Sequence, residues 1–185
     1  MMLDQWLDRI PKLKKRWTRY QRFFTEIHVP AKTTLLKEGE ISRRIFFVRK
    51  GSLRASVDNR GKDTTFQFFF EGDAVASIES FWTRQPSPMR ISSIEPSTLG
   101  VLHKDGFDAL VRDFPEINDL LLELAIRRLE QYAKLFSSYL KSTPRQRHLA
   151  LMRENPNIIQ RVPQYLIASY LGITPVSLSR IRRRT

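Results

Sequence analysis

The sequence predicts an α+β protein with an N-terminal β-roll of the jelly-roll type, a long helix and a C-terminal helix-turn-helix domain. Three patterns predict this order: short apolar runs between turn residues, then apolar residues at three- and four-residue steps, then a compact pair of helices near the C-terminus. We expect the boundaries at residues 1–113, 114–141 and 142–185. The length of 185 residues fits one medium domain or two small ones, which excludes a large multidomain enzyme.

The first unit has the sequence pattern of short strands. Runs rich in Phe, Val, Ile and Thr alternate with glycines that mark turns, and their even spacing is typical of a β-barrel or β-sandwich. The runs are TTLLKEGE, RIFFVRKGSLRASV, DNRGKDTTFQFFFEGDAV and RISSIEPSTLGVL, with Gly39, Gly51, Gly61 and Gly72 at the turns. Ahead of them, residues 1–22 predict an amphipathic helix with Trp6, Trp17 and Tyr20. We favour packing of these aromatic side chains on the neighbouring roll over contact with a membrane surface or a nucleic acid.

The long helix carries two apolar stripes. One contains Leu121, Leu124 and Leu135, and the other contains Leu122, Ile126, Leu129 and Phe136. A helix that is wet on one side needs only one apolar stripe. We therefore expect the first stripe to lie on the roll and the second to pair with the same helix of another protomer. The alternative is one helix sandwiched within a monomer.

The segment QYLIASYLGITPVSLSRIRR, residues 164–183, predicts the helix-turn-helix. Ala168 is the small residue where two helices cross, Gly172 allows a turn with positive φ, and Thr174 caps the second helix. The apolar contact between the helices is expected from Ile167, Leu171, Ile173, Leu178 and Ile181. Because these requirements meet within one short segment, the pattern is specific.

The second of these helices presents candidate DNA-binding residues. We expect contacts to bases from Val176, Ser177 and Arg180, and contacts to phosphates from Thr174, Arg182, Arg183 and Arg184. Arg180 is the natural base reader, because one guanidinium can bond guanine O6 and N7 together. The alternative is a solvated helix end at which the arginines complement the helix dipole.

The formal net charge of +13 is concentrated at the two ends of the chain. Residues 1–22 have seven basic and two acidic side chains, residues 23–141 have 17 and 16, and residues 142–185 have eight arginines and one glutamate. Such an excess on one short unit favours a polyanionic partner such as double-stranded DNA. The chain has no cysteine, which excludes disulfides, a cysteine nucleophile and an iron–sulfur cluster. We find no signal-like or membrane-spanning segment, and expect a cytoplasmic protein without a membrane partner.

These residues resemble the Crp/Fnr family of bacterial transcription regulators over nearly the whole chain. The resemblance lies in GSLRASV after RIFFVRK, in FEGDAVAS, in the helix of residues 114–140 and in IASYLGITPVSLSRIR. It implies a homodimer that places two recognition helices in successive major grooves of a near-palindromic DNA site. It also implies a sensory roll of the cyclic-nucleotide-binding type, contact with RNA polymerase and no enzymatic activity.

The resemblance further implies an effector pocket in the roll, and there the sequence departs from the family pattern. The pocket is expected around Gly72, Asp73, Ala76, Ser77, Pro88, Met89 and Arg90. Members that bind a cyclic nucleotide carry Gly-Glu where this chain has Ala76 and Ser77, and an arginine at or near Pro88. A buried phosphate without a cation is costly, so we expect no response to cAMP or cGMP. The pocket then either accepts another small molecule or is filled by Phe68, Phe70, Phe81 and Trp82.

Other interpretations of the chain stay open. Glu79 and Arg90 would replace the missing pocket residues if the register shifts. A second hypothesis is a sensory module for a small, nucleotide-like molecule that acts through protein contacts. We expect no cofactor and no metal, because lone histidines, here His28, His103 and His148, are more often structural. An enzyme lacks support, since the sequence contains no Gly-rich phosphate loop and no HExxH motif.

Overall fold

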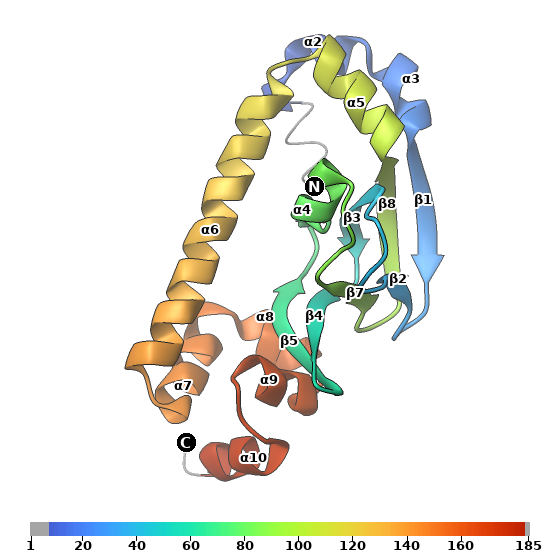
Figure 1. The fold of residues 1–185 in the computed structure, drawn as a ribbon. Helices are drawn as coiled ribbons and strands as arrows, with labels where there is room; N and C mark the ends of the chain where they lie inside the picture. Colours follow the sequence, from blue (N-terminus) through green and yellow to red (C-terminus); the bar gives the residue numbers. More distant parts are fainter. Residues whose placement is uncertain (1–7, 184–185) are drawn as a thin grey trace.

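The computed structural model describes residues 8–183 and confirms the predicted α+β architecture (Figure 1). The strands are β1 (Phe24–Val29), β2 (Thr34–Leu36), β3 (Arg44–Lys50), β4 (Leu53–Asn59), β5 (Lys62–Phe69), β6 (Ala74–Val75), β7 (Arg90–Ser93) and β8 (Ser97–His103). The helices up to the end of the roll are α2 (Pro11–Lys15), α3 (Trp17–Tyr20), the 3₁₀-helix η1 (Gln21–Phe23), α4 (Ile78–Thr83) and α5 (Lys104–Asp113). The remaining helices are α6 (Ile117–Lys141), α7 (Pro144–Glu154), α8 (Pro156–Arg161), α9 (Gln164–Tyr170) and α10 (Pro175–Arg183).

The roll consists of two antiparallel four-stranded sheets, with strand orders β1-β8-β3-β6 and β2-β7-β4-β5. Successive residues of a strand point to opposite faces, so one apolar set from each sheet meets in a shared core. This core includes Phe46, Val48, Leu53, Ala55, Phe69, Ile91, Leu99 and Val101. The alternating runs in the sequence therefore correspond to strands, whereas the short helix α4 inside the roll is an addition that the pattern did not predict.

The turn between β3 and β4 depends on Gly51. Its φ of +99° lies in the left-handed region, and a Cβ there would stand 2.8 Å from the carbonyl oxygen of Pro96 and 2.7 Å from Cβ of Ser97. We expect Gly51→Ala to lower the free energy of unfolding by about 3 kcal/mol or more, because backbone strain adds to a steric clash. Urea unfolding followed by circular dichroism measures the loss.

The matched control is Gly61→Ala in the β4–β5 turn. Gly61 also has a positive φ, +82°, but no described heavy atom lies within 4 Å of the position its Cβ would take. This variant should therefore lose only the strain of a left-handed residue, about 1–2 kcal/mol. Equal losses in the two variants would contradict the packing argument for Gly51.

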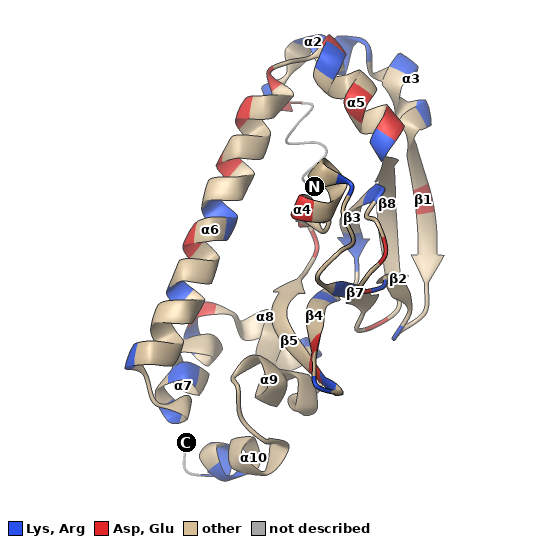
Figure 2. Ribbon diagram, viewed as in Figure 1, with Lys and Arg blue, Asp and Glu red and all other residues tan. Residues whose placement is uncertain are grey.

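The N-terminal helices pack on the end of the roll. Tyr20 is buried in the same apolar cluster as Phe107 of α5. Trp17 packs against Phe24 of β1, with ring centroids 5.1 Å apart. The aromatic side chains thus lie on the roll, as favoured from the sequence, while Lys and Arg residues of this segment are exposed at the same end of the molecule (Figure 2). Trp6 lies outside the described residues.

Helix α6 runs from the α5 end of the molecule to the C-terminal helices (Figure 1). Its two stripes have different surroundings. Leu121 and Leu124 pack against the apolar cluster that includes Phe107, whereas Leu135 faces a cavity next to α7. The second stripe is exposed, so the chain does not sandwich this helix within one protomer. We call this exposed stripe the α6 seam, formed by Leu122, Ile126, Leu129, Ala133, Phe136 and Leu140.

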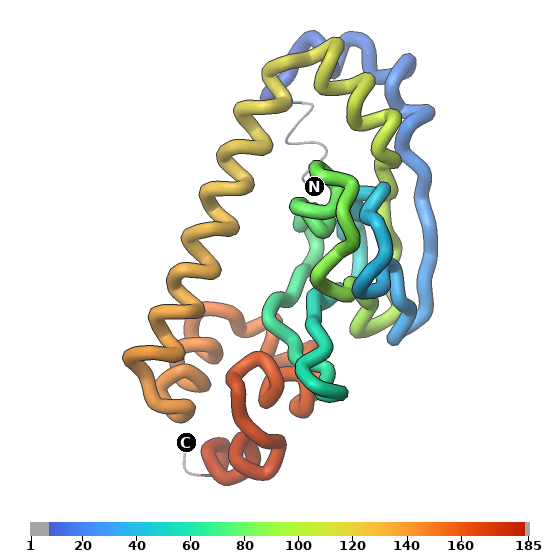
Figure 3. The backbone as a smooth tube through the Cα atoms, viewed as in Figure 1, coloured from blue at the N-terminus to red at the C-terminus, as the bar shows by residue number. Residues whose placement is uncertain are grey.

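The C-terminal helices dock on the second sheet of the roll. Leu151, Ile158 and Leu166 share an apolar cluster with Phe68 of β5 and Ile94 of the β7–β8 turn. The backbone N–H of Thr65 in β5 donates to Oγ of Ser169 in α9, 3.0 Å away. Figure 3 shows the β4–β5 hairpin reaching these helices. The roll and the C-terminal unit therefore share one interface within the chain.

Candidate functional site

Helices α9 and α10 meet across the tight turn that the sequence predicts. Gly172 in this turn has a φ of +68°. Ala168 and Leu178 are buried where the two helices cross. Oγ1 of Thr174 accepts the backbone N–H of Ser177 at 3.1 Å, which caps the start of α10. The small residue, the turn glycine and the cap thus occupy the places that the sequence predicts.

The outer face of α10 is exposed and basic (Figure 2). Val176 is 61% exposed, and Arg180 and Arg183 follow it on the same face, because helix positions four and seven apart are neighbours. Ser177 is half-buried, and its Oγ lies 3.0 Å from Oγ1 of Thr174. The described candidate contacts, Thr174, Val176, Ser177, Arg180, Arg182 and Arg183, therefore gather at one exposed end of the molecule. Arg184 lies outside the described residues.

Arg147 of α7 ties the α9–α10 turn to the long helix. Its guanidinium donates to the carbonyl oxygens of Ser142, at 2.7 Å, and Leu171, at 3.0 Å, and lies 4.7 Å from the ring centroid of Tyr139. The Tyr139 hydroxyl in turn donates to the carbonyl oxygen of Tyr170. A displacement of the end of α6 would therefore move the turn before α10, because these contacts join the two. No local sequence pattern indicates this contact, because Arg147 and Leu171 are 24 positions apart.

Ion pairs join α8 to two turns of the roll. Arg161 donates to both carboxylate oxygens of Glu71, at 2.7 and 2.8 Å, and to Glu95 at 2.5 Å. The guanidinium lowers the pKa of Glu71 to about 2, and Glu71 also accepts the backbone N–H of Gly51. This paired arrangement fixes the C-terminal unit against the roll at a second place, next to the apolar cluster around Phe68.

The burial of His148 in α7 predicts that the stability of this unit depends on pH. It is 2% exposed, and its Nδ1 finds no hydrogen-bond partner within residues 8–183. Burial lowers the pKa of His148 from its usual 6.5, and the charge of Arg182 lowers the pKa further. The folded state thus favours neutral imidazole, so this stabilisation is complete above pH 6.5 and is lost as the pH falls toward the lowered pKa.

We expect the free energy of unfolding to fall on acidification below about pH 6.5, by at most about 1.4 kcal/mol per pH unit from this one group. Urea unfolding of the full chain over that pH range measures the slope. His148→Gln should have a shallower slope than the parent chain, because its side chain does not titrate. An unchanged slope in this variant would show that other groups cause the pH dependence.

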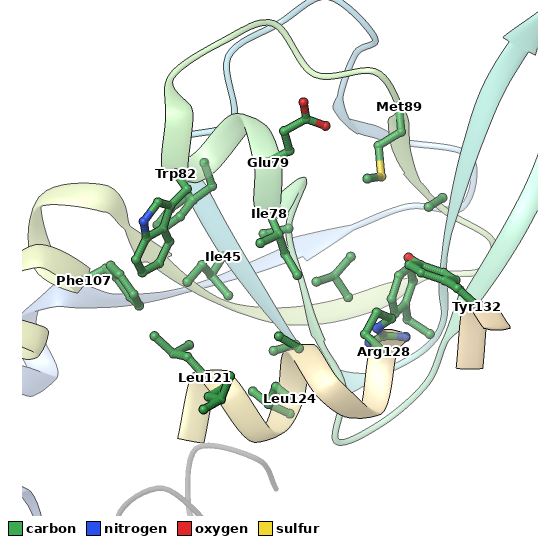
Figure 4. Close-up of a pocket in the computed structure, with 18 of the residues that line it drawn as sticks. Ile45, Ile78, Glu79, Trp82, Met89, Phe107, Leu121, Leu124, Arg128 and Tyr132 are labelled. Atoms are coloured by element: carbon green, nitrogen blue, oxygen red, sulfur yellow. The ribbon is translucent and has the colours of Figure 1, made fainter. Parts of the chain in front are cut away.

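A cavity of about 430 Å³ lies between the roll and α6 (Figure 4). Its walls come from both sheets of the roll and from α4, α5 and α6, and they are mainly apolar. Among the described lining residues, Glu79 and Arg128 are the charged ones. Arg128 lies 4.9 Å from the ring centroid of Phe69 and donates to Oε1 of Gln131 at 3.1 Å. The aromatic part of the wall consists of Phe69, Phe81, Trp82, Phe107 and Tyr132.

Two of the seven residues predicted for the effector pocket, Ala76 and Met89, line this cavity. Asp73 lines a second cavity of about 450 Å³ between β5, α6 and α7, and burial raises the pKa of Asp73. Arg90 lines a small cavity beside the β4–β5 hairpin, so it does not replace a phosphate-binding arginine in the main cavity. Gly72, Ser77 and Pro88 line none of these three cavities.

Of the two alternatives for the pocket, the one in which Phe68, Phe70, Phe81 and Trp82 fill it does not describe this cavity. Phe81 and Trp82 line the cavity without filling it. Phe68 and Phe70 instead line the second cavity, on the side of the C-terminal helices. The reason is the alternation of β5, in which Phe69 points into the main cavity and its two neighbours point to the opposite face.

The roll matches a known family of domains. Residues 26–114, from β1 to the end of α5, match the family model of the cyclic nucleotide-binding domain. Solved structures of the Crp/Fnr type share the fold beyond this domain. A comparison with curated protein sequences finds no match.

Three of these structures illustrate the likeness. FixK2 from Bradyrhizobium japonicum is 14% identical with a TM-score of 0.77, and the match covers 87% of this chain and 83% of that one. CLP, a c-di-GMP-responsive global regulator from Xanthomonas campestris, is 15% identical with a TM-score of 0.75, covering 90% and 88%. A mutant of CooA from Carboxydothermus hydrogenoformans is 17% identical with a TM-score of 0.69, covering 88% and 76%. At these identities the likeness establishes a common fold.

The described part of the chain contains neither a candidate metal-binding cluster nor a helix suited to crossing a bilayer. Within residues 8–183, no group of three or more His, Cys, Asp or Glu side chains is arranged to hold a metal ion. None of the helices there combines the length and apolar character needed to cross a bilayer. The cavity next to α6 and the exposed face of α10 are therefore the two features on which we base a function.

Proposed function

We propose that this chain is a sequence-specific DNA-binding transcription regulator of the Crp/Fnr type, with α9 and α10 as its helix-turn-helix. The observation that carries the proposal is the exposed basic face of α10, with Val176, Arg180 and Arg183, on a helix whose inner residue Leu178 is buried. A helix held in this way can enter a major groove with its first residues at base edges. The arginine excess of residues 142–185 supplies attraction to phosphates.

The proposed regulator is a homodimer formed through the α6 seam. Leu122, Leu129 and Phe136 recur every seven residues, and Ile126 lies between the first two at steps of four and three. This spacing is the pattern of a two-stranded coiled coil. In a dimer built on it, two α10 helices would meet half-sites about 34 Å apart on one face of the duplex.

The remaining parts of the proposal concern the signal and the partners. We do not expect cAMP or cGMP to be the effector, because Arg90 stands in a cavity separate from the one beside α6. A bacterial protein that regulates transcription while bound to DNA is expected to contact RNA polymerase and to lie in the cytoplasm. The proposal includes no enzymatic activity and no cofactor.

The test begins with selection of a preferred site from a random DNA pool by the full chain. Arg180→Ala should then lose discrimination between this site and scrambled duplexes by about 1–3 kcal/mol, or roughly 5–150-fold, because it removes the base contact. Arg182→Ala should weaken all duplexes alike. Fluorescence anisotropy of labelled duplexes measures both effects.

Two results would overturn parts of this proposal. If Arg180→Ala keeps both affinity and site preference, Arg180 is not the base reader. If the full chain shows no salt-sensitive binding to any duplex, the alternative of a sensory module that acts through protein contacts is favoured instead.

A further inference from the structure

We propose that the cavity between the roll and α6 binds a small, mainly apolar molecule with a single anionic group, and that Arg128 holds that group. This proposal extends the proposed function and depends on it in one respect, namely that the roll acts as a sensor. It names the chemical class of the effector, which the fold leaves open.

The wall of the cavity defines the apolar part of this ligand. The cavity has a volume of about 430 Å³, which lies in the range of pockets that enclose small molecules. Trp82 is 57% exposed and Ile78 is 55% exposed, although both are large apolar side chains on the cavity wall. An apolar ring or chain placed against them would remove this surface from water, which is favourable at about 25 cal/mol per Å².

Arg128 defines the anionic part. Its guanidinium is half-buried, stacks on Phe69 and donates to the neutral amide of Gln131. No carboxylate within residues 8–183 lies within ion-pair distance of it, in contrast to Arg161, which has two carboxylate partners, although Arg128 also lines the second cavity, where its charge acts on the partly buried Asp73. In Figure 4, Arg128 and Tyr132 lie together on one side of the cavity, and Glu79 lies on the opposite side. A half-buried guanidinium that donates to a neutral amide and to no described carboxylate favours an anion at its side of the cavity.

The same wall disfavours a nucleotide. A ribose and a purine edge bring several donors and acceptors, and each one that enters an apolar cavity without a partner costs free energy. Among the described lining residues, few polar groups besides Arg128 are available, chiefly Asn118, Glu79 and the hydroxyl of Tyr132. One carboxylate or sulfonate on an apolar body needs one cation only, which is what α6 provides.

A matched pair of fluorescent probes tests the class of ligand. 1-Anilinonaphthalene-8-sulfonate and N-phenyl-1-naphthylamine share a ring system and differ by the sulfonate. Both should bind the full chain with enhanced emission. Arg128→Met should weaken the sulfonate probe by about tenfold or more, the effect of losing a hydrogen bond to a charged group, and should change the neutral probe by less than about threefold. Cyclic AMP should displace neither probe.

Further variants place the probes in the cavity. Ala76→Trp fills the cavity and should weaken both probes by about tenfold or more. If this variant does not fold, as judged by circular dichroism, Ala125→Trp on the α6 side of the same cavity replaces it. Ile41→Ser removes an exposed apolar residue of the β2–β3 loop, which lies outside both the cavity wall and the α6 seam, and should leave both probes within about threefold.

Four outcomes would overturn the inference: unchanged affinity for the sulfonate probe in Arg128→Met, unchanged affinity for both probes in the filled variant, loss of binding of both probes in Ile41→Ser, or displacement of either probe by cyclic AMP. Probe binding is measured without DNA. A failure here therefore leaves the DNA-binding proposal standing, and failure of duplex binding leaves the ligand class standing.

Discussion

Raising the salt concentration from 50 to 200 mM should weaken binding of this protein to its DNA site by roughly 10³–10⁵-fold, the range for 6–10 phosphate contacts. Residues 142–185 contain eight arginines and one glutamate, so a dimer has enough cations for this number of contacts. The physical reason is that each neutralised phosphate releases condensed counterions, which becomes less favourable in salt. Anisotropy titrations at several salt concentrations give the slope of log affinity against log salt.

Two matched variants show where the contacts are made. Arg183→Gln removes one proposed phosphate contact from each protomer, so the slope should become shallower by about 2 in a dimer. Arg22→Gln makes the same change in charge at the opposite, N-terminal end of the molecule and should leave the slope unchanged. A slope near zero for the parent chain, or equal effects of the two variants, would contradict the assignment.

Leu129→Ser should dissociate the proposed dimer. Leu129 is 68% exposed in the single chain and lies in the middle of the α6 seam. Full burial of a leucine is worth about 1.5–3 kcal/mol, and a dimer buries two copies, so the dimer dissociation constant should rise by roughly 10²–10⁴-fold. Analytical ultracentrifugation measures this constant directly. Affinity for a two-half-site duplex should fall with it, whereas the fold of each protomer should persist.

The control for this variant is Arg127→Ser, which introduces the same residue two positions earlier on another exposed face of α6. It should leave the dimer dissociation constant within about threefold, as expected for a surface substitution. A parent chain that is monomeric at micromolar concentration would refute the dimer. An unchanged dissociation constant in Leu129→Ser would place the interface elsewhere.

The parts of the structure that the sequence predicts well are those with a local signal. Strand alternation marks the roll, because burial on one face repeats every second residue. The α9–α10 turn was recognised because Ala168, Gly172 and Thr174 each meet a different steric or hydrogen-bonding requirement within a few residues. The two stripes of α6 were visible because a helix repeats its faces every three to four residues.

The parts that were missed depend on contacts between distant residues. Arg161 and Glu71 are 90 positions apart, and nothing next to either residue indicates the pair. Arg128 of α6 is a charged residue on the wall of the main cavity, but the sequence pointed only to residues 72–77 and 88–90, on either side of α4, because the expected family pattern is confined there. Helices α4 and α8 have six residues each, which is too short to show a period.

The apolar cluster that joins the roll to the C-terminal helices bears on how the protein could switch. Any rotation of α10 that carries α9 with it must part Ser169 from β5 and bring Phe68 into water. Exposure of one phenylalanine costs about 1.5–3 kcal/mol, which binding of a ligand or of DNA can supply. The area buried in this small contact thus sets the free-energy difference between two orientations of α9 and α10 relative to the roll. A single substitution at Phe68 would bias that equilibrium without changing the wall of the main cavity beside α6 or the proposed DNA-binding face of α10.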